Sequence, residues 1–182
     1  MYKGNNPTAL QSQKMITDAL LFLMESKDFS KINVKEICDK ALVSRQTFYS
    51  LFQTKEEVIE LYFDKLFTDY AKQFEKSQVI TVRYICSTSV SYLFENRFFI
   101  GLLVNNNLNY IMTRKMEEYL IELGSIINAS KRKEDPYAMA FISGALVEII
   151  SRYIKNNSFE NPEEISILIE KILTGKYFGI NL

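Results

Sequence analysis

Apolar residues recur at helical spacing along most of this chain. The segment 8–26 opens with Thr8 as a candidate N-cap and carries apolar residues at the i, i+3, i+4, i+7 positions of one helix face, namely Ile16, Ala19, Leu20 and Leu23. No segment sustains the alternation typical of a strand. From Val79 onward the pattern is helical, with breaks near Asn96 and at 105–107, 133–136 and 156–162. The pattern therefore predicts an all-α fold.

Three helix starts fall close together between residues 33 and 57. Asn33 followed by Glu36 resembles a capping box for a short helix over 34–40. Ser44 can cap a second short helix over 45–51. Thr54 with Glu57 fits the capping box of a long helix that runs to about Lys76. The spacing predicts two short helices joined by a tight turn, followed by a long helix.

Two segments near the C-terminus are unusually apolar. Segment 137–155 is apolar on nearly every face, and segment 163–174 has an apolar stripe that begins after Pro162. We expect one side of this combined surface to face a second copy of the chain in a four-helix interface, with Ala140 and Gly144 allowing close approach. The expected interface residues are Ala140, Gly144, Val147, Ile165, Leu168, Ile169 and Ile172.

The two short helices have the composition of a DNA-reading helix pair. Such a pair needs a small residue where the helices cross, a place that Cys38 can fill, and apolar residues that hold the second helix. The residues available for these internal contacts are Ile37, Val43, Phe48 and Leu51. Polar side chains remain to point outward, and their types suit guanine, adenine, thymine and phosphate: Arg45, Gln46, Thr47, Tyr49 and Ser50. The pattern therefore predicts a helix-turn-helix that reads double-stranded DNA.

Residues 32–59, INVKEICDKALVSRQTFYSLFQTKEEVI, resemble the N-terminal DNA-binding domain of the TetR family of bacterial regulators. The most specific part is V-S-R-Q-T-F-Y-x-x-F-x-x-K-E-E, and the resemblance covers residues 8 to about 62. Through RQTFY and through Glu95-Asn96-Arg97-x-Phe99, the chain is also similar to a subgroup that includes the activator of the dihydroxyacetone kinase operon. This similarity implies that the effector could be another protein and that the regulator could activate as well as repress.

The resemblance assigns roles by position within the motif. It implies that Ser44 caps the recognition helix, that Phe48 and Phe52 are core residues, and that base and phosphate contacts come from Arg45, Gln46, Thr47, Tyr49 and Lys55. Two positions depart from the family pattern. Leu42 stands where a turn glycine is usual, and a leucine at positive φ costs roughly 1 kcal/mol or more. Leu51 replaces a His or Tyr that commonly touches the DNA backbone.

Composition narrows the class of function. The chain has no histidine, no paired catalytic carboxylates at a recognisable spacing and no phosphate-binding glycine loop, so we expect no enzyme, no cofactor and no metal. The alternative, an enzyme that uses an all-helical apolar cavity, ranks far below a regulator. Eight basic and five acidic residues up to residue 55 give that part a net charge of +3, and the remainder carries −3. The positive charge is therefore concentrated where the DNA motif lies.

Location and cysteine chemistry follow from the same composition. No apolar run approaches the ~20 residues of a membrane span, and the N-terminus lacks a signal core, so we expect a cytoplasmic protein without membrane contact. Cys38 and Cys86 lie far apart, which favours free, buried thiols.

The sequence divides into a helix-turn-helix domain over 1–53 and a helical ligand-binding and dimerisation domain over 54–182. Candidate ligand contacts are Tyr84, Phe98, Met112, Met116 and Tyr119, with Arg83, Arg114 and Glu148 as polar candidates. We expect a homodimeric regulator, such as a repressor, that binds a palindromic operator and responds to an effector. The alternatives are a regulator controlled by a partner protein and one without a small-molecule pocket, acting as an activator.

Overall fold

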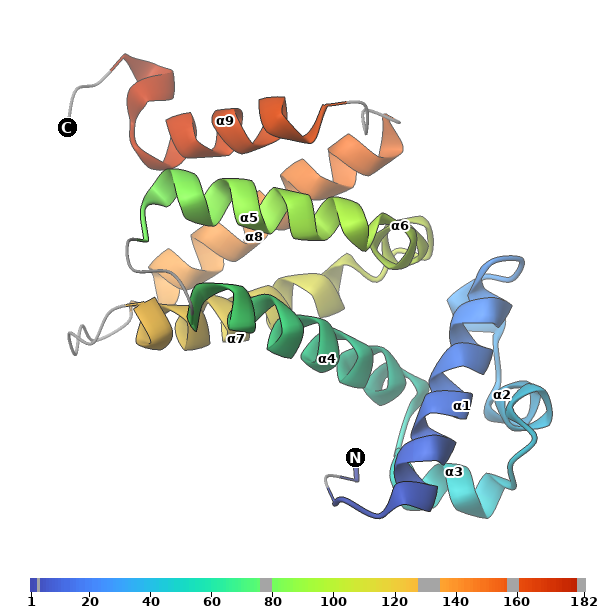
Figure 1. Cartoon of the computed structure of the whole chain (residues 1–182). Helices are drawn as coiled ribbons and strands as arrows, with labels where there is room; N and C mark the ends of the chain where they lie inside the picture. Colours follow the sequence, from blue (N-terminus) through green and yellow to red (C-terminus); the bar gives the residue numbers. More distant parts are fainter. Residues whose placement is uncertain (3, 76–79, 128–134, 157–160, 180–182) are drawn as a thin grey trace.

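The computed structural model describes residues 1–2, 4–75, 80–127, 135–156 and 161–179, and every regular element among them is helical (Figure 1). The predicted all-α class is confirmed. The elements are α1 Pro7–Met24, η1 Phe29–Lys31, α2 Val34–Ala41, α3 Arg45–Leu51, α4 Lys55–Glu75, α5 Val82–Glu95, α6 Arg97–Asn105, α7 Asn109–Ile127, α8 Pro136–Lys155, α9 Pro162–Leu173 and η2 Lys176–Phe178.

The first three helices form a small unit at one end of the molecule, and α4 leads from it into the second bundle (Figure 1). α1 packs on both α2 and α3. Apolar side chains from each helix meet between them, and Ile16, Ile37 and Phe48 are fully buried there. Burial of these side chains fixes the angle between α2 and α3, since each large apolar side chain contributes roughly 1.5–3 kcal/mol.

The helix starts follow local capping chemistry with one shift. α1 begins at Pro7 rather than after Thr8, and the Asn6 side chain accepts a hydrogen bond from the Thr8 N–H at 2.9 Å. Proline lacks an N–H and is preset for the first helical position, which moves the start upstream. The capping box of Asn33 and Glu36 is confirmed.

The start of α4 contains only half of the expected capping box. The Thr54 hydroxyl accepts from the Glu57 N–H at 3.3 Å, but the Glu57 carboxylate accepts from the Gln53 N–H at 2.9 Å instead of from Thr54. α4 is described to Glu75, so the expected end at Lys76 lies outside the described residues.

The second bundle is built from α4 to α9. α4 and α8 pack against α7, and α5 lies along α9. The predicted breaks near Asn96 and at 105–107 are confirmed, because α5 gives way to α6 and α6 to α7 at these places. α7 ends before the next predicted break and α8 begins at Pro136, while Val79 and Lys133 lie outside the described residues.

α8 contains the segment that is apolar on nearly every face. Its 20 residues contain an 18-residue stretch of mean hydropathy 1.3, which is long and apolar enough, by length and composition alone, to cross a membrane. The expectation that no run approaches this length was therefore wrong. Only 28% of that stretch is buried inside the structure, so much of the apolar surface of α8 is uncovered in the single chain.

Candidate nucleic-acid interface

The turn between α2 and α3 contains a leucine in the left-handed conformation. Leu42 has φ 54° and ψ 39°, and its side chain is 85% exposed. The N–H of the next residue, Val43, donates to the Cys38 carbonyl at 3.0 Å and closes the turn. The turn thus keeps the geometry that a glycine would adopt easily, and the chain accepts the strain of about 1–2 kcal/mol that a Cβ atom brings there.

α3 divides its seven residues between a buried side and an exposed side. Phe48 and Leu51 are buried, and Phe52 directly after the helix is 1% exposed, so these residues anchor α3 as expected. The Leu51 side chain faces this core and leaves the surface of the helix to other residues. On the other side, Arg45, Gln46, Tyr49 and Ser50 are exposed.

Ser44 fixes the first turn of α3. Its hydroxyl accepts from the Thr47 N–H at 3.0 Å, and the two side-chain hydroxyls lie 2.9 Å apart. Ser44 therefore has the capping geometry that the motif implies. Thr47 is half-buried and engaged in this cap. Arg45, Gln46 and Tyr49 lie on the exposed side of the helix.

Lys55 is engaged inside the first unit instead of projecting beside α3. Its ammonium donates to the carbonyl of Phe29 at 2.5 Å and to that of Ile32 at 2.8 Å, and it lies 4.3 Å from the centre of the Phe29 ring. Burial lowers the pKa of this ammonium below its ordinary value. The implied phosphate contact by Lys55 therefore needs correction: the side chain ties η1 to the start of α4.

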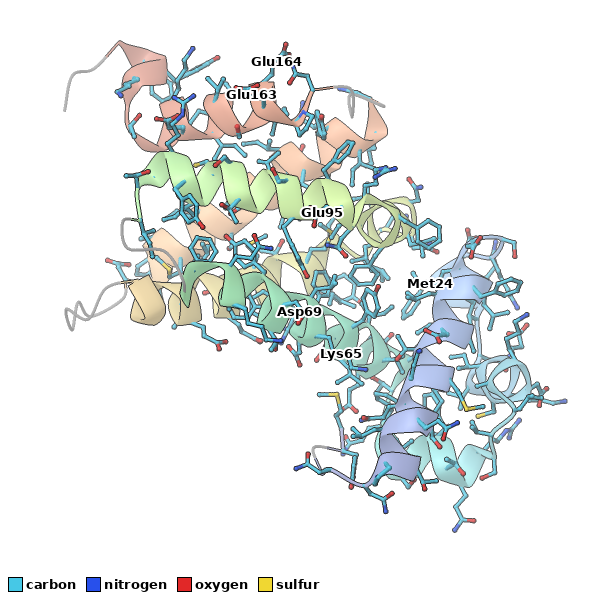
Figure 2. All side chains as sticks on the ribbon, viewed as in Figure 1. Met24, Lys65, Asp69, Glu95, Glu163 and Glu164 are labelled. Atoms are coloured by element: carbon cyan, nitrogen blue, oxygen red, sulfur yellow. The ribbon has the colours of Figure 1, made fainter. Side chains whose placement is uncertain are left out.

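A second tie of η1 leads to the other bundle. The Phe29 N–H donates to Oδ1 of Asn106 at 2.6 Å, and Asn106 sits in the turn between α6 and α7. The sequence indicated a helix junction at 105–107, which is confirmed, but gave no sign of this contact. An asparagine at a junction between helices was the only local signal available. Figure 2 shows Met24 at the end of α1 that lies nearest the second bundle.

The second bundle contains a cavity of about 190 Å³ that is partly open to solvent and is lined by residues of α4 to α9. Met112, Met116 and Tyr119 line it, in agreement with their selection from the sequence. Tyr84 and Phe98 are not brought to it. Phe98 is 59% exposed on α6, and Tyr84 packs edge-on against Phe74 near the end of α4.

The polar residues selected for a ligand head group form surface ion pairs. Arg83 pairs with Glu170 at 3.4 Å, and Glu148 pairs with Arg152 at 2.6 Å. Arg114 pairs with Glu60 on α4. None of the three lines the cavity.

One polar network links a cavity residue to α4. The Tyr119 ring stacks on Phe67 with ring centres 4.1 Å apart, and its hydroxyl donates to Asp64 at 3.0 Å. Lys115 lies 2.6 Å from Asp64 and 2.5 Å from Glu118. Burial and the charge of Asp64 raise the pKa of the Tyr119 hydroxyl, and Lys115 has a raised pKa because these hydrogen bonds outweigh its own burial. The network was not visible in the sequence.

The residues selected for a dimer interface fall into two groups. Val147 and Ile169 are buried inside the protomer and pack in its own core, so they do not form its outer surface. Ala140 is exposed, and the remaining residues are half-buried: Gly144, Ile165, Leu168 and Ile172.

Both cysteines are free and buried, as expected, and burial raises the pKa of each thiol.

Residues 16–62 match the family model described as "Bacterial regulatory proteins, tetR family". The HTH-type dhaKLM operon transcriptional activator DhaS of Lactococcus lactis is 28% identical over 94 residues, covering 48% of this chain and 50% of the relative. The uncharacterized HTH-type transcriptional regulator YxbF of Bacillus subtilis is 22% identical over 175 residues, or 92% of this chain and 46% of the relative. The chain thus spans about half the length of the curated relatives that it matches.

Solved structures show the same fold along the whole chain. Lin0861 from Listeria innocua superposes with a TM-score of 0.81 at 15% identity, covering 99% of this chain and 97% of that one. The dihydroxyacetone kinase operon activator DhaS superposes with a TM-score of 0.56 at 22% identity, covering 94% and 98%. The helix-turn-helix at 34–51 lies inside the family match and has an exposed polar side on α3. Residues 16–62 therefore match the DNA-binding domain of the TetR family, and the chain is similar to the transcriptional regulator DhaS.

Proposed function

We propose that this chain is a homodimeric regulator that reads a palindromic operator with α3 and changes its operator affinity when an effector occupies the cavity in the second bundle. The observation that carries the proposal is the division of α3. Phe48 and Leu51 hold the helix in the core, while Arg45, Gln46 and Tyr49 stand exposed on the other side.

The exposed residues suit readout of DNA. An arginine such as Arg45 can form two hydrogen bonds with guanine, and Gln46 can pair with adenine in the major groove. Tyr49 can donate a hydrogen bond to a phosphate, which sets the position of the helix without reading sequence. Thr47 stays in the proposed contact set through its methyl group, although its hydroxyl takes part in the Ser44 cap.

Dimerisation is supported by the uncovered face of α8. Phe141 is 76% exposed, and a Cβ atom added at Gly144 would have no neighbour within 4 Å. A helix of a second copy can approach closely at such a place. The proposed interface is therefore narrower than the sequence suggested and consists of Ala140, Gly144, Ile165, Leu168 and Ile172. Two recognition helices set about 34–36 Å apart would then reach successive major grooves.

Effector control is supported by the network between the cavity and α4. Occupancy of the cavity would displace the Tyr119 ring, and through Asp64 would shift α4, which leads to α3. Coupling of this kind typically changes affinity by a factor of about 5–150.

We also propose that the chain divides into a DNA-binding domain over 1–53 and a ligand-binding and dimerisation domain over 54–182, and that the protein is cytoplasmic.

The sign of regulation has two candidates. Repression is the simplest outcome of operator occupancy, whereas activation is favoured by the name of the DhaS relative, an operon transcriptional activator. The resemblance to this subgroup keeps control by a partner protein as the alternative. Native mass spectrometry of the purified chain in cell extract separates control by a partner protein from control by a small molecule, because a sensor of small molecules should form no stable complex with another protein beyond its own dimer.

The test of DNA binding is a gel shift with the region upstream of the gene at several salt concentrations. Arg45→Ala with Tyr49→Ala should weaken binding at least about tenfold, because each lost contact is worth about 1–3 kcal/mol. The matched control removes an exposed arginine and an exposed tyrosine from the second bundle, Arg97→Ala with Tyr110→Ala, and should leave affinity unchanged. Absence of sequence-selective binding, or equal losses in both double variants, would overturn the proposal.

A further inference from the structure

The lining of the cavity in the second bundle is uncharged. Twenty-two of the described residues line it, and none is Asp, Glu, Lys or Arg. Four charged side chains of the surrounding helices are exposed and lie away from this lining, Lys65 and Asp69 on α4 and Glu163 and Glu164 on α9 (Figure 2). A buried ligand charge would therefore meet no partner among these lining residues. Burying an ion without a partner is strongly unfavourable.

The hydroxyl groups that line the cavity already donate their hydrogen bonds to the protein. Tyr92 donates to the Leu66 carbonyl at 2.8 Å, and Tyr119 donates to Asp64 at 3.0 Å. Ser89 donates to the Ile85 carbonyl at 2.7 Å, so the 2.6 Å contact between the Tyr70 and Ser89 hydroxyls uses the Tyr70 proton. What these hydroxyls still offer a ligand is oxygen lone pairs. They can accept a hydrogen bond from a ligand hydroxyl but have no proton left for a carboxylate.

The nearest basic side chain in the network is neutralised. Lys115 neighbours the lining residue Tyr119, and its ammonium lies 2.6 Å from Asp64 and 2.5 Å from Glu118. A carboxylate in the cavity would have to compete with these two acids for the same ammonium. The cavity thus disfavours an anion, and its apolar lining also disfavours a cation.

The volume limits the size of the occupant. An apolar cavity of about 150 Å³ takes benzene, and this one measures about 190 Å³. We propose that it binds an uncharged, mainly apolar molecule of the size of a medium-chain alcohol or a small alkylbenzene, with at most one hydroxyl group. This inference rests on the proposed function, because it names the class of effector for the same site.

The test compares three probes of equal chain length on the full chain at pH 8. The probes are 1-octanol, octanoate and octylammonium, and each is tested for displacement of indole, an uncharged fluorophore of a size similar to that of the proposed ligand. The chain has no tryptophan that would interfere with this fluorescence. We expect 1-octanol to displace the fluorophore at a concentration at least about tenfold lower than either ion. Equal or tighter displacement by octanoate or octylammonium would overturn the proposal.

Two variants locate the binding site. Met116→Lys introduces a cation into the lining and should reverse the preference, so that octanoate displaces the fluorophore better than 1-octanol. The matched control, Ile121→Lys, places the same cation at an exposed position of α7 and should keep the preference for 1-octanol. If Met116→Lys fails to fold by circular dichroism, the cavity-filling Leu146→Phe replaces it and should weaken 1-octanol binding. Unchanged 1-octanol binding in a folded cavity variant would contradict the proposal.

Operator binding is measured on the same preparation. If the chain does not bind the operator but still prefers 1-octanol, the proposed function is wrong and the proposed ligand class is retained. Preference for an ion with normal operator binding would overturn the ligand class alone.

Discussion

The backbone N–H of Phe29 donates a hydrogen bond to Oδ1 of Asn106 at 2.6 Å. The amide group of Asn106 in turn donates to the Leu102 carbonyl at 2.8 Å, which holds the side chain in place. Because the Phe29 carbonyl also accepts from Lys55, hydrogen bonds run without interruption from α6 to the start of α4. This route joins the two parts of the chain independently of the covalent path through α4.

Asn106→Ala should weaken communication between the two parts. It removes both hydrogen bonds of this side chain, so we expect a loss of about 1–3 kcal/mol in stability and a smaller change in operator affinity on addition of 1-octanol. Binding of 1-octanol itself should persist. The measurement is operator titration with and without 1-octanol. Asn105→Ala, at an exposed neighbouring position, is the control. An undiminished response in Asn106→Ala would show that the coupling takes another route.

Lys55→Met should destabilise the protein without changing the salt dependence of DNA binding. The substitution leaves the carbonyls of Phe29 and Ile32 without this donor, which costs about 1–3 kcal/mol. A lost phosphate contact would instead lower the slope of log K against log salt by about 0.9. Urea unfolding and operator titrations at four salt concentrations separate the two roles. A reduced slope with unchanged stability would restore the phosphate contact.

Leu42→Gly should stabilise the protein. Leu42 has φ 54° and is exposed, so glycine relieves the strain and loses little buried surface. We expect a gain of about 1 kcal/mol, seen as a rise in Tm of about 2–4 °C. Asp39→Gly, at an exposed helical position of α2, should lower Tm because glycine is unfavourable there. A fall in Tm for both variants would mean that the turn is not strained.

Alkaline pH should destabilise the fold partly through Tyr70. Burial raises the pKa of Tyr70 from 10.0 to about 12. Between these values the unfolded chain releases this proton while the folded chain retains it, so stability is complete below pH 10 and is lost as the pH rises toward 12. Urea midpoints from pH 8 to 11.5 should fall less steeply in Tyr70→Phe than in the parent. Tyr177→Phe, at an exposed position, should match the parent slope.

Features set by neighbouring residues could be predicted from the sequence. The bounds of α3 and the cap at Ser44 follow from three or four consecutive positions, and the positive φ of Leu42 follows from its place in the turn. The predicted N-cap at Thr8 was wrong by two residues, because Asn6 and Pro7 together make a better helix start.

Contacts between distant segments could not be predicted in the same way. Asn106 and Phe29 are 77 positions apart, and Lys55 reaches back 26 positions to the Phe29 carbonyl. Helical spacing identifies which side of a helix is apolar but not which other helix covers it. For that reason Met116 and Phe98 received the same interpretation, although one lines the cavity and the other lies on the surface.

The division of α3 also bears on how such a regulator can evolve. Phe48 and Leu51 carry the packing, whereas Arg45, Gln46 and Tyr49 lie in solvent. Exposed substitutions usually change stability by less than about 0.5 kcal/mol. After gene duplication, a copy could therefore acquire a new operator through a few changes at these three positions while its fold, its cavity and its pairing surface stayed the same.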